Sequence, residues 1–391
     1  MGHPAGAERG SARDAVRVLF VLGTRPEAIK LAPVILALGA DPRSDVRTCV
    51  TGQHRAMLDQ VLSLFEIAPD HDLDLMQPNQ TLASLTCRVI DGVTGVLSAV
   101  RPDWVMVQGD TTTAFAAALS AFYSGARIAH VEAGLRTGDL KAPWPEELNR
   151  KLVSVMTDRH YAPTERAKLN LLAESVPEKR ILVTGNTVID ALLWAVSRIE
   201  RDGALQESLG RQFAFLDPSR RLVLVTGHRR ESFGEGFRSL CRALRRIAAR
   251  PDAQLVYPVH LNPNVQQPVH EILGGAPNVT LIEPVEYLPF VYLMAHSHII
   301  ITDSGGVQEE APSLGKPVLV MRDTTERPEA VDAGTVELVG TDEERIVASA
   351  SRLLDDEDAH ERMARAHNPY GDGQSSARIV GDLLSGAGTS A

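Results

Sequence analysis

Residues 16–30, VRVLFVLGTRPEAIK, decide the fold class of this 391-residue chain. A run of β-branched and large apolar side chains ends at Leu22, and Pro26 follows at a position that starts a helix well. Arg25 lies in the turn between strand and helix. A strand that leads through a short turn into a helix is the building unit of a parallel α/β sheet, so the stretch predicts such a sheet.

The same alternation of short apolar runs and amphipathic helical windows continues along the chain. Strands are expected at 16–22, 46–51, 104–108, 127–131, 160–162 and 181–184, and then at 221–226, 254–258, 279–282, 299–302, 317–321 and 336–339. The pattern predicts an α/β protein with two Rossmann-like, doubly wound domains, each sheet being covered by helices on both faces.

The length favours two domains of roughly 150 to 200 residues each. A helical window from Thr187, broken near Gly203, and the turn-rich residues 216–219 indicate a junction between about 187 and 220. We expect a flexible leader at 1–14, an N-terminal domain at 15–187 and a C-terminal domain at 188–366. Residues 367–391 contain a last helix that is expected to return to the N-terminal domain.

Composition limits the classes of partner. A net charge of −10 with 44% hydrophobic residues argues against nucleic acid and membrane surfaces as partners, so an anionic ligand needs local basic groups. Three scattered cysteines predict a reducing compartment, and neither a signal peptide nor an uninterrupted apolar run of membrane-spanning length is found. We expect a cytoplasmic protein. His296-Ser297-His298 and Asp72-Leu73-Asp74 lack further ligands, so no metal is expected, and the second suggests an edge strand.

Polar and glycine-bearing groups cluster where the expected strands end. In open α/β sheets, ligands bind outside the carboxyl ends of the strands, so two such edges facing each other would make an interdomain cleft. The groups are Gly23–Glu27, Thr51–His54, Gln108–Thr111, Glu132–Gly134, Gly227–Glu231, His260–Asn262, Glu283–Glu286, Asp303–Gly306 and Arg322–Asp323.

The segment Ser304-Gly305-Gly306 allows two interpretations. Its backbone N–H groups, between a strand and a helix, can approach a phosphate closely. It is not a Walker loop, because Gly315-Lys316 is followed by proline, and no dinucleotide fingerprint follows any strand. A plain helix cap, with Ser304 as N-cap, explains the segment equally well.

Basic residues stand at the matching turn of each half. Arg25 follows the first strand, and Lys30 lies five residues further on. His228 and Arg229 follow the first strand of the second half. Basic clusters at the sheet edges of an acidic protein favour contact with phosphate.

Carboxylates are the candidates for acid and base chemistry. Asp110 and Glu132 follow two adjacent strands, where desolvation would raise their pKa, although Asp110 can also be an N-cap. Glu146 and Glu147 follow Pro143-Trp144-Pro145, so a helix start explains them equally. The aromatic side chains of Trp144 and Phe290 can wall a pocket or belong to the core, the core being the default.

Taken together, these segments resemble the non-hydrolysing UDP-N-acetylglucosamine 2-epimerase family of bacteria. The resemblance runs in order from about Val16 to Leu384. It rests on the segments 23–30, 109–112, 130–137, 145–150, 226–231, 302–306, 326–329 and 368–371. It implies two GT-B-like domains, a homodimer, interconversion of UDP-GlcNAc and UDP-ManNAc, and no cofactor.

Site residues follow by matching position. The resemblance implies that the UDP moiety, bound by the C-terminal domain, is surrounded by Arg25, Lys30, His228, Ser304, Gly305, Gly306 and Arg327. It places Glu310 at the ribose and Phe290 at the uracil, with Val285 where some members carry a polar Gln. Asp110, Glu132 and Glu146 match the catalytic carboxylates, and His228 is counted with them. Gln53, Arg229 and His260 match positions at which a second UDP-GlcNAc activates bacterial members.

The chemistry explains why such groups are needed. The proton at sugar C2 has no adjacent carbonyl, so a carboxylate cannot remove it directly. Elimination of UDP to a glycal, followed by protonation of C2 on the other face and return of UDP, avoids this barrier. The product would supply ManNAc-type sugars for surface polysaccharide. A GT-B glycosyltransferase, a hydrolysing epimerase that releases ManNAc and UDP, and a non-catalytic sensor are the alternatives.

Overall fold

The computed structural model describes residues 15–52, 55–77, 80–229 and 233–385, so the expected leader at 1–14 lies outside the described residues. The chain forms two compact units, one running to Thr184 and resuming at Ser376, the other being Gly185–Ser375. The first unit is therefore built from two separate stretches of sequence, and each unit is described by itself.

The first unit holds a seven-stranded sheet in the order β3-β2-β1-β4-β5-β6-β7, in which every pair of neighbours is parallel. Its strands are β1 (Val16–Leu22), β2 (Ser44–Val50), β3 (His71–Asp72), β4 (Trp104–Gln108), β5 (Arg127–Val131), β6 (Arg159–Ala162) and β7 (Ile181–Val183). The short β3 confirms the expected edge strand at Asp72.

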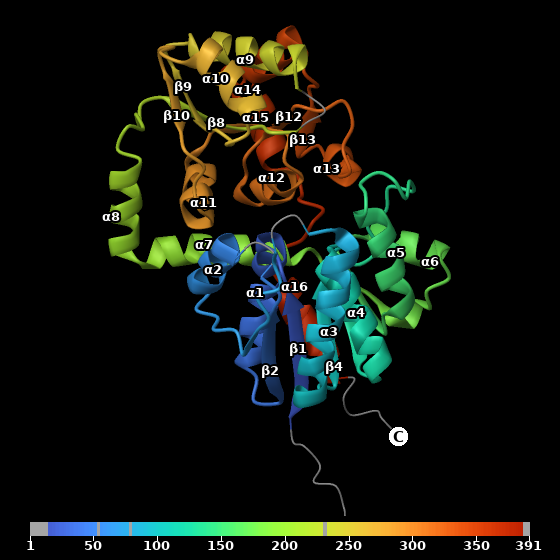
Figure 1. Ribbon diagram of the computed structural model, residues 1–391. Coiled ribbons are helices and arrows are strands. Elements are labelled where there is room, and N and C mark those ends of the chain that lie inside the picture. Colours follow the sequence, from blue (N-terminus) through green and yellow to red (C-terminus); the bar gives the residue numbers. More distant parts are fainter. Residues whose placement is uncertain (1–14, 53–54, 78–79, 230–232, 386–391) are drawn as a thin grey trace, which may run out of the picture. The chain divides into compact units, whose positions relative to one another are not determined.

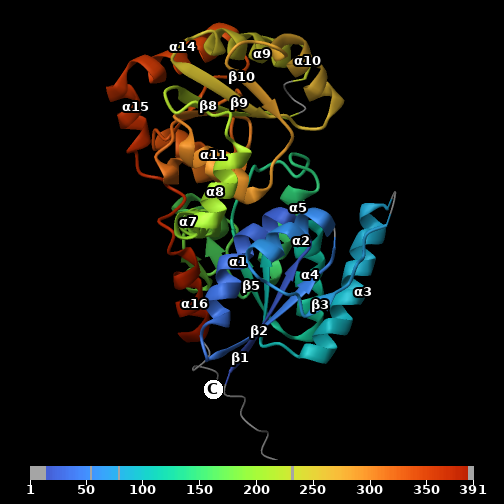
Figure 2. The same cartoon turned by 90° about the vertical axis from the view of Figure 1, so that its left-hand side faces the viewer.

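Helices cover both faces of this sheet, and Figure 2 shows α3 on one side of it and α16 on the other. The helices are α1 (Arg25–Gly39), α2 (Arg55–Leu64), α3 (Leu82–Val100), α4 (Thr112–Ser124), α5 (Glu146–Met156), α6 (Glu165–Ala173), the 3-10 turn η1 (Glu178–Arg180) and α16 (Ser375–Ser385). Because both faces are covered, the central strands are continuously apolar, and all five residues of β4 are buried.

The helix α3 is long and apolar enough, by length and composition alone, to cross a membrane. Its apolar stripe, which includes Leu85, Val89 and Val93, is nevertheless buried in the core together with residues of α4. Its opposite side is exposed and carries Asp91. This arrangement is that of an amphipathic core helix.

The second unit holds a six-stranded parallel sheet in the order β10-β9-β8-β11-β12-β13. Its strands are β8 (Arg221–Thr226), β9 (Ala253–Pro258), β10 (Val279–Ile282), β11 (Ile299–Thr302), β12 (Val318–Val320) and β13 (Val336–Leu338). The two sheets confirm the predicted α/β class with two Rossmann-like domains.

In the second unit, α9, α10 and α14 cover one face of the sheet, and α11 and α12 lie on the other face (Figure 1). The helices are α7 (Thr187–Arg201), α8 (Gly203–Gln212), α9 (Glu235–Ala248), α10 (Pro263–Leu273), α11 (Tyr287–His296), α12 (Gly305–Glu310), the 3-10 turn η3 (Ala311–Leu314), α13 (Pro328–Asp332), α14 (Glu343–Asp355) and α15 (Glu357–Ala364). The break expected near Gly203 separates α7 from α8.

The structure moves both expected domain limits. The first unit ends at Thr184, and residues 367–375, which were expected to begin the return segment, belong to the second unit. The physical reason is that Asn368 donates from Nδ2 to the backbone oxygen of Glu309 at 2.9 Å, while Tyr370 is buried. The return helix α16 does belong to the first unit, where Asp382 forms an ion pair with Arg159.

Candidate active site

Each sheet changes direction of winding at its first strand. In the first unit β1 lies between β2 and β4, and in the second unit β8 lies between β9 and β11. Such topological switch points open a crevice at the carboxyl ends of the two central strands. The loops that begin at Gly23 and Gly109, and at Gly227 and Asp303, leave the sheets at these points.

The loop after β1 is held by a buried carboxylate. Thr24 and Glu27 form a capping box, and Glu27 Oε2 accepts from the backbone N–H groups of Gly23 at 3.0 Å and Thr24 at 2.7 Å. Thr111 donates from its hydroxyl to Glu27 Oε1 at 2.7 Å, and burial raises the pKa of Glu27. Glu27 therefore ties the β1 loop to the β4 loop. Arg25 becomes the first residue of α1, and its side chain is partly exposed.

Lys30 and Glu132 meet beside these loops. Lys30 Nζ lies 2.5 Å from Glu132 Oε2, and the side chains of both residues are largely buried. Gln108, the last residue of β4, donates from Nε2 to the same carboxylate oxygen. Glu132 has a positive φ of 63°, which a non-glycine residue seldom adopts, so its turn holds the carboxylate in place at the cost of backbone strain.

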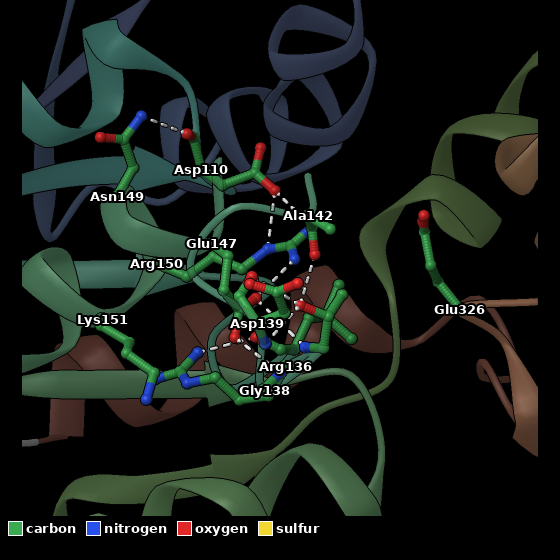
Figure 3. A network of polar contacts seen from close by, with 12 residues as sticks. Asp110, Arg136, Gly138, Asp139, Ala142, Glu147, Asn149, Arg150, Lys151 and Glu326 are labelled. Carbon is green, nitrogen blue, oxygen red and sulfur yellow. Dashed lines mark hydrogen bonds and ion pairs between the residues drawn. The ribbon is translucent and has the colours of Figure 1, made fainter. Parts of the chain in front are cut away.

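Asp110 is paired with Arg150 of α5 (Figure 3). Its Oδ2 accepts from Arg150 Nε at 2.8 Å and lies 2.7 Å from Nη2. Burial raises the pKa of Asp110, while Arg150 opposes this shift and Glu132 adds to it. The N-cap alternative for Asp110 is wrong, because Thr111 is the N-cap of α4 and accepts from Ala114 N–H.

The pair Glu146 and Glu147 divides into two roles. Glu147 is fully buried and accepts from the backbone N–H groups of Thr137 and Gly138, both at 3.1 Å, and from Arg150. It fixes the 137–138 loop and Arg150 and has no free face for a substrate (Figure 3). Glu146 starts α5 as a partly exposed side chain and forms no ion pair with any residue described in the structure.

Trp144 does not belong to the core, since its side chain is 66% exposed. The core default for Trp144 is therefore wrong: the proline-flanked turn before α5 carries its indole outward. Phe290 lies in α11 with a partly buried side chain. Phe290 is therefore neither fully in the core nor fully exposed.

In the second unit, Asp303 organises the loop after β8. Its buried Oδ2 accepts from the backbone N–H groups of His228 at 2.6 Å and Arg229 at 2.8 Å, and its Oδ1 lies 3.4 Å from His228 Nδ1. The imidazole of His260 stacks on that of His228, with a ring-centroid separation of 5.1 Å. Of the three residues expected at a second UDP-GlcNAc site, His260 and Arg229 thus lie beside His228, and Gln53 lies outside the described residues.

The segment Ser304–Gly306 enters α12 without a side-chain cap. Ser304 occupies the N-cap position, yet its hydroxyl accepts no hydrogen bond from the helix. A Cβ atom on Gly305 would lie 3.3 Å from Arg327 Cζ, so this guanidinium packs directly on the glycine backbone. The simple cap interpretation loses its main support, and a backbone edge with a cation beside it is what an anion requires.

Glu310 points to the same edge from the far end of α12. Its Oε2 accepts from the hydroxyl of Tyr287 at 3.1 Å, and a Cβ on Gly306 would lie 3.5 Å from its Oε1. A buried carboxylate beside a glycine backbone is an acceptor for hydroxyl groups of a ligand.

One residue beside the candidates in each unit was not singled out from the sequence. In the second unit Glu309 is buried and pairs with Arg327 Nε at 2.8 Å, and in the first unit Arg150 orients Asp110. Each is a charged residue at a helix position that faces the interior, where apolar residues are usual. A charged residue at such a position is the sequence signal that could have identified them. Among the described residues, no group of three or more His, Cys, Asp or Glu side chains is placed to hold a metal ion.

Comparison with known proteins decides the family. The family model described as UDP-N-acetylglucosamine 2-epimerase matches residues 36–384. The chain belongs to the UDP-N-acetylglucosamine 2-epimerase family. It is 59% identical over 371 residues to the UDP-N-acetylglucosamine 2-epimerase of Salmonella typhimurium, a match that covers 95% of this chain and 99% of that protein. The resemblance stated from the sequence motifs is thereby confirmed.

Solved structures of the family agree in fold. The UDP-GlcNAc 2-epimerase of Neisseria meningitidis, crystallised with UDP-GlcNAc bound, matches with a TM-score of 0.88 and 52% identity over 95% of this chain and 100% of that chain. A glycosyltransferase from Rickettsia africae matches at 14% identity with a TM-score of 0.64 over 97% of this chain and 100% of that chain, which shows likeness of fold alone. The prediction of two Rossmann-like domains is thus confirmed for this member of the epimerase family.

Proposed function

We propose that this protein is a non-hydrolysing epimerase that interconverts UDP-GlcNAc and UDP-ManNAc. The observation that carries the proposal is the buried pair of Lys30 and Glu132 beside Asp110, at the switch point of one sheet, in a chain of the epimerase family. The relative from Neisseria meningitidis binds UDP-GlcNAc, which supports the same substrate here.

The second unit supplies groups suited to the UDP moiety. The Ser304–Gly306 backbone and Arg327 bind the diphosphate, Glu310 accepts from the ribose hydroxyls, and Phe290 lies by the uracil. The diphosphate assignment rests on the N-terminal edge of α12, which has no side-chain cap, and on the guanidinium that packs against Gly305. The N–H of Ser304 donates to Thr302 Oγ1 at 2.9 Å, so the backbone donors proposed for the ligand are those of Gly305 and Gly306. Val285 stands where some members carry Gln; a backbone contact to the base would leave uracil recognition unchanged, and a side-chain contact would weaken it. By their match to the family's motifs, we also assign Arg25, Lys30 and His228 to the departing diphosphate, whose charge cations would stabilise.

The reaction begins with cleavage of the bond between sugar C1 and the diphosphate oxygen. As UDP leaves, C1 becomes electron-poor and the hydrogen on C2 becomes acidic, so a carboxylate removes it and a C1–C2 double bond forms. A second acid then protonates C2 from the opposite face, and the diphosphate oxygen of UDP returns to C1. The sugar is neither oxidised nor reduced, and water is not consumed.

Two faces of C2 require more than one acid or base. Asp110, whose pKa is raised by burial, and Glu132, held between Lys30 and Gln108, are the two groups that share one buried environment. Glu146 has a partly exposed carboxylate at the start of α5 and is the third candidate. We assign the proton transfers to these three residues as a set, with His228 as a cation at the leaving group.

One experiment tests the activity. The protein is incubated with UDP-GlcNAc in D2O without an acceptor, and the sugar signals are followed by NMR. We expect UDP-ManNAc with deuterium at C2, together with loss of the C2 proton from recovered UDP-GlcNAc. Absence of exchange at C2 would exclude epimerisation and favour a glycosyltransferase or a sensor, whereas free ManNAc in amounts equal to UDP would indicate a hydrolysing enzyme.

The proposal includes a homodimer formed through the first unit. Apolar side chains stand exposed on α5 at Leu148, Leu152 and Val155, the last being 84% exposed, and Phe122 and Tyr123 are exposed at the end of α4. Exposed apolar groups gathered on neighbouring helices are typical of a surface covered by a second copy. Sedimentation should give a dimer that Val155→Glu dissociates, and a monomeric wild type would exclude this surface as an interface.

Regulation by a second UDP-GlcNAc, a cytoplasmic location and supply of surface polysaccharide remain part of the proposal. Regulation is supported by the packing of His260 on His228. Initial rates measured against UDP-GlcNAc concentration test it, since activation gives a sigmoidal curve and a lone site gives a hyperbola. The interdomain cleft stays a prediction.

A further inference from the structure

Glu309 receives hydrogen bonds from three parts of the second unit. Its Oε1 lies 2.8 Å from Arg327 Nε, and its Oε2 accepts from Asn186 Nδ2 at 3.1 Å. Its backbone oxygen accepts from Asn368 Nδ2 at 2.9 Å. The side chain is almost fully buried, so Arg327 and Asn186, which contact the carboxylate, compensate for the removal of its charge from water, while Asn368 satisfies the backbone oxygen.

Two of these partners lie where the chain passes between the units. Asn186 is the second residue of the second unit and caps α7, and its backbone N–H donates to Tyr370 O at 2.7 Å. Asn368 precedes Tyr370 in the segment by which the chain leaves this unit. Asn368 also donates to Ser313 Oγ at 2.6 Å. Glu309 therefore joins both crossing segments through a single buried residue.

The third partner, Arg327, packs against the backbone of Gly305 at the edge assigned to the diphosphate. A guanidinium has five N–H donors and can bind more than one anion. The same guanidinium lies 3.1 Å from Glu326 Oε2 through Nη1. Of the two carboxylates on Arg327, only Glu309 is bonded to the crossing segments by the contacts above.

From this geometry we propose that Glu309 is a positioning residue that couples occupation of the diphosphate edge to the two segments that connect the units. An anion that binds to Arg327 weakens the ion pair between Arg327 and Glu309. The carboxylate of Glu309 then bonds more strongly to Asn186, and a shift of the α12 backbone alters the hydrogen bond from Asn368. The inference rests on the proposed assignment of Arg327 to the UDP site.

The test compares Glu309→Gln with the wild type in the full-length protein. Gln keeps the shape and an acceptor but removes the charge. We expect the Kd for UDP to change by less than about threefold, while kcat falls about three- to thirtyfold with little change in KM, which is the size of a coupling between sites. Hydrogen exchange at residues 185–187 and 368–371 should slow when UDP binds to the wild type and not when it binds to Glu309→Gln.

Two further variants separate coupling from structure. Glu326→Gln removes the other carboxylate on Arg327 and is expected to keep the exchange response to UDP. Asn186→Ser keeps a good N-cap but lacks the amide that reaches Glu309, so it should reproduce the loss of response, and it serves if Glu309→Gln does not fold. Glu309→Asp, which retains the charge, should recover part of kcat.

Several outcomes would overturn the inference. An undiminished exchange response in Glu309→Gln or Asn186→Ser would show that these contacts carry no coupling. A parallel loss of UDP affinity and melting temperature in both variants would reduce Glu309 to a structural role. Wild-type protein that binds UDP but forms no UDP-ManNAc would refute the proposed function and leave the exchange comparison intact, and wild type without UDP affinity would refute both.

Discussion

At the scale of single residues, two features of the surroundings of Asp110 shift the pKa of its carboxyl group in opposite directions. Burial raises its pKa, and the guanidinium of Arg150 lowers it. We predict that Asp110→Asn removes measurable turnover, because an amide cannot exchange a proton with C2, while UDP affinity stays within about tenfold of the wild type. Calorimetric titration with UDP and a coupled assay check this. A large loss of UDP affinity would instead assign Asp110 to the architecture of the loop.

Arg150 makes a second prediction, about pH. Since Arg150 lowers the pKa of Asp110, its removal raises that pKa further, and a higher pH is then needed to ionise the carboxylate. The acidic limb of the kcat/KM profile should move upward in Arg150→Gln, by about one pH unit or more. Lys151→Gln is the matched control, because within the described part of the chain Lys151 forms an ion pair only with Glu174, at 3.4 Å. An unmoved limb would remove Asp110 from the titrating groups.

At the scale of elements, the turn after β5 shows how the packing of a helix places a catalytic candidate. Gly134 has a φ of +93°, and a Cβ at this position would lie 2.3 Å from the backbone oxygen of Ala167 in α6. We predict that Gly134→Ala lowers the free energy of unfolding by about 2–4 kcal/mol, from strain and overpacking together. Gly95→Ala, in α3 with open space around it, should raise this free energy by about 0.5–1 kcal/mol. Equal effects in urea unfolding would contradict the argument.

At the scale of the whole molecule, the sequence predicts the strands well because parallel strands that are buried on both faces consist of short runs of apolar residues. The positions of polar groups that directly follow such runs are predicted for a related reason: Asp110 lies at the carboxyl edge of the first sheet and Asp303 at that of the second, while their roles stay predictions. The sequence does not predict which side chains that are distant in the chain form hydrogen bonds with each other. Nothing near Glu309 in the chain points to Asn186 or Asn368, and the split of Glu146 from Glu147 depends on a loop ten residues away.

The division into units leads to the last prediction. Gly185–Ser375 is continuous in sequence, and its ends are joined by the bonds from Asn186 N–H to Tyr370 O at 2.7 Å and from Ser375 N–H to Asp190 Oδ2 at 3.3 Å. A fragment of these residues should therefore fold cooperatively by itself. A fragment ending at Thr184 should not, because it lacks α16.

The return helix accounts for this difference. Ile379 and Leu383 of α16 are buried, each contributing about 1.5–3 kcal/mol to folding, and Asp382 pairs with Arg159. Joining residues 375–391 to residues 1–184 through a flexible linker should restore a single cooperative transition, which circular dichroism during heating would detect. Substituting Leu383→Asp in the linked fragment should abolish that transition, since a buried charge would then lack a partner. A stable fragment 1–184 without α16 would contradict the view that the first unit needs both stretches of sequence to complete its core.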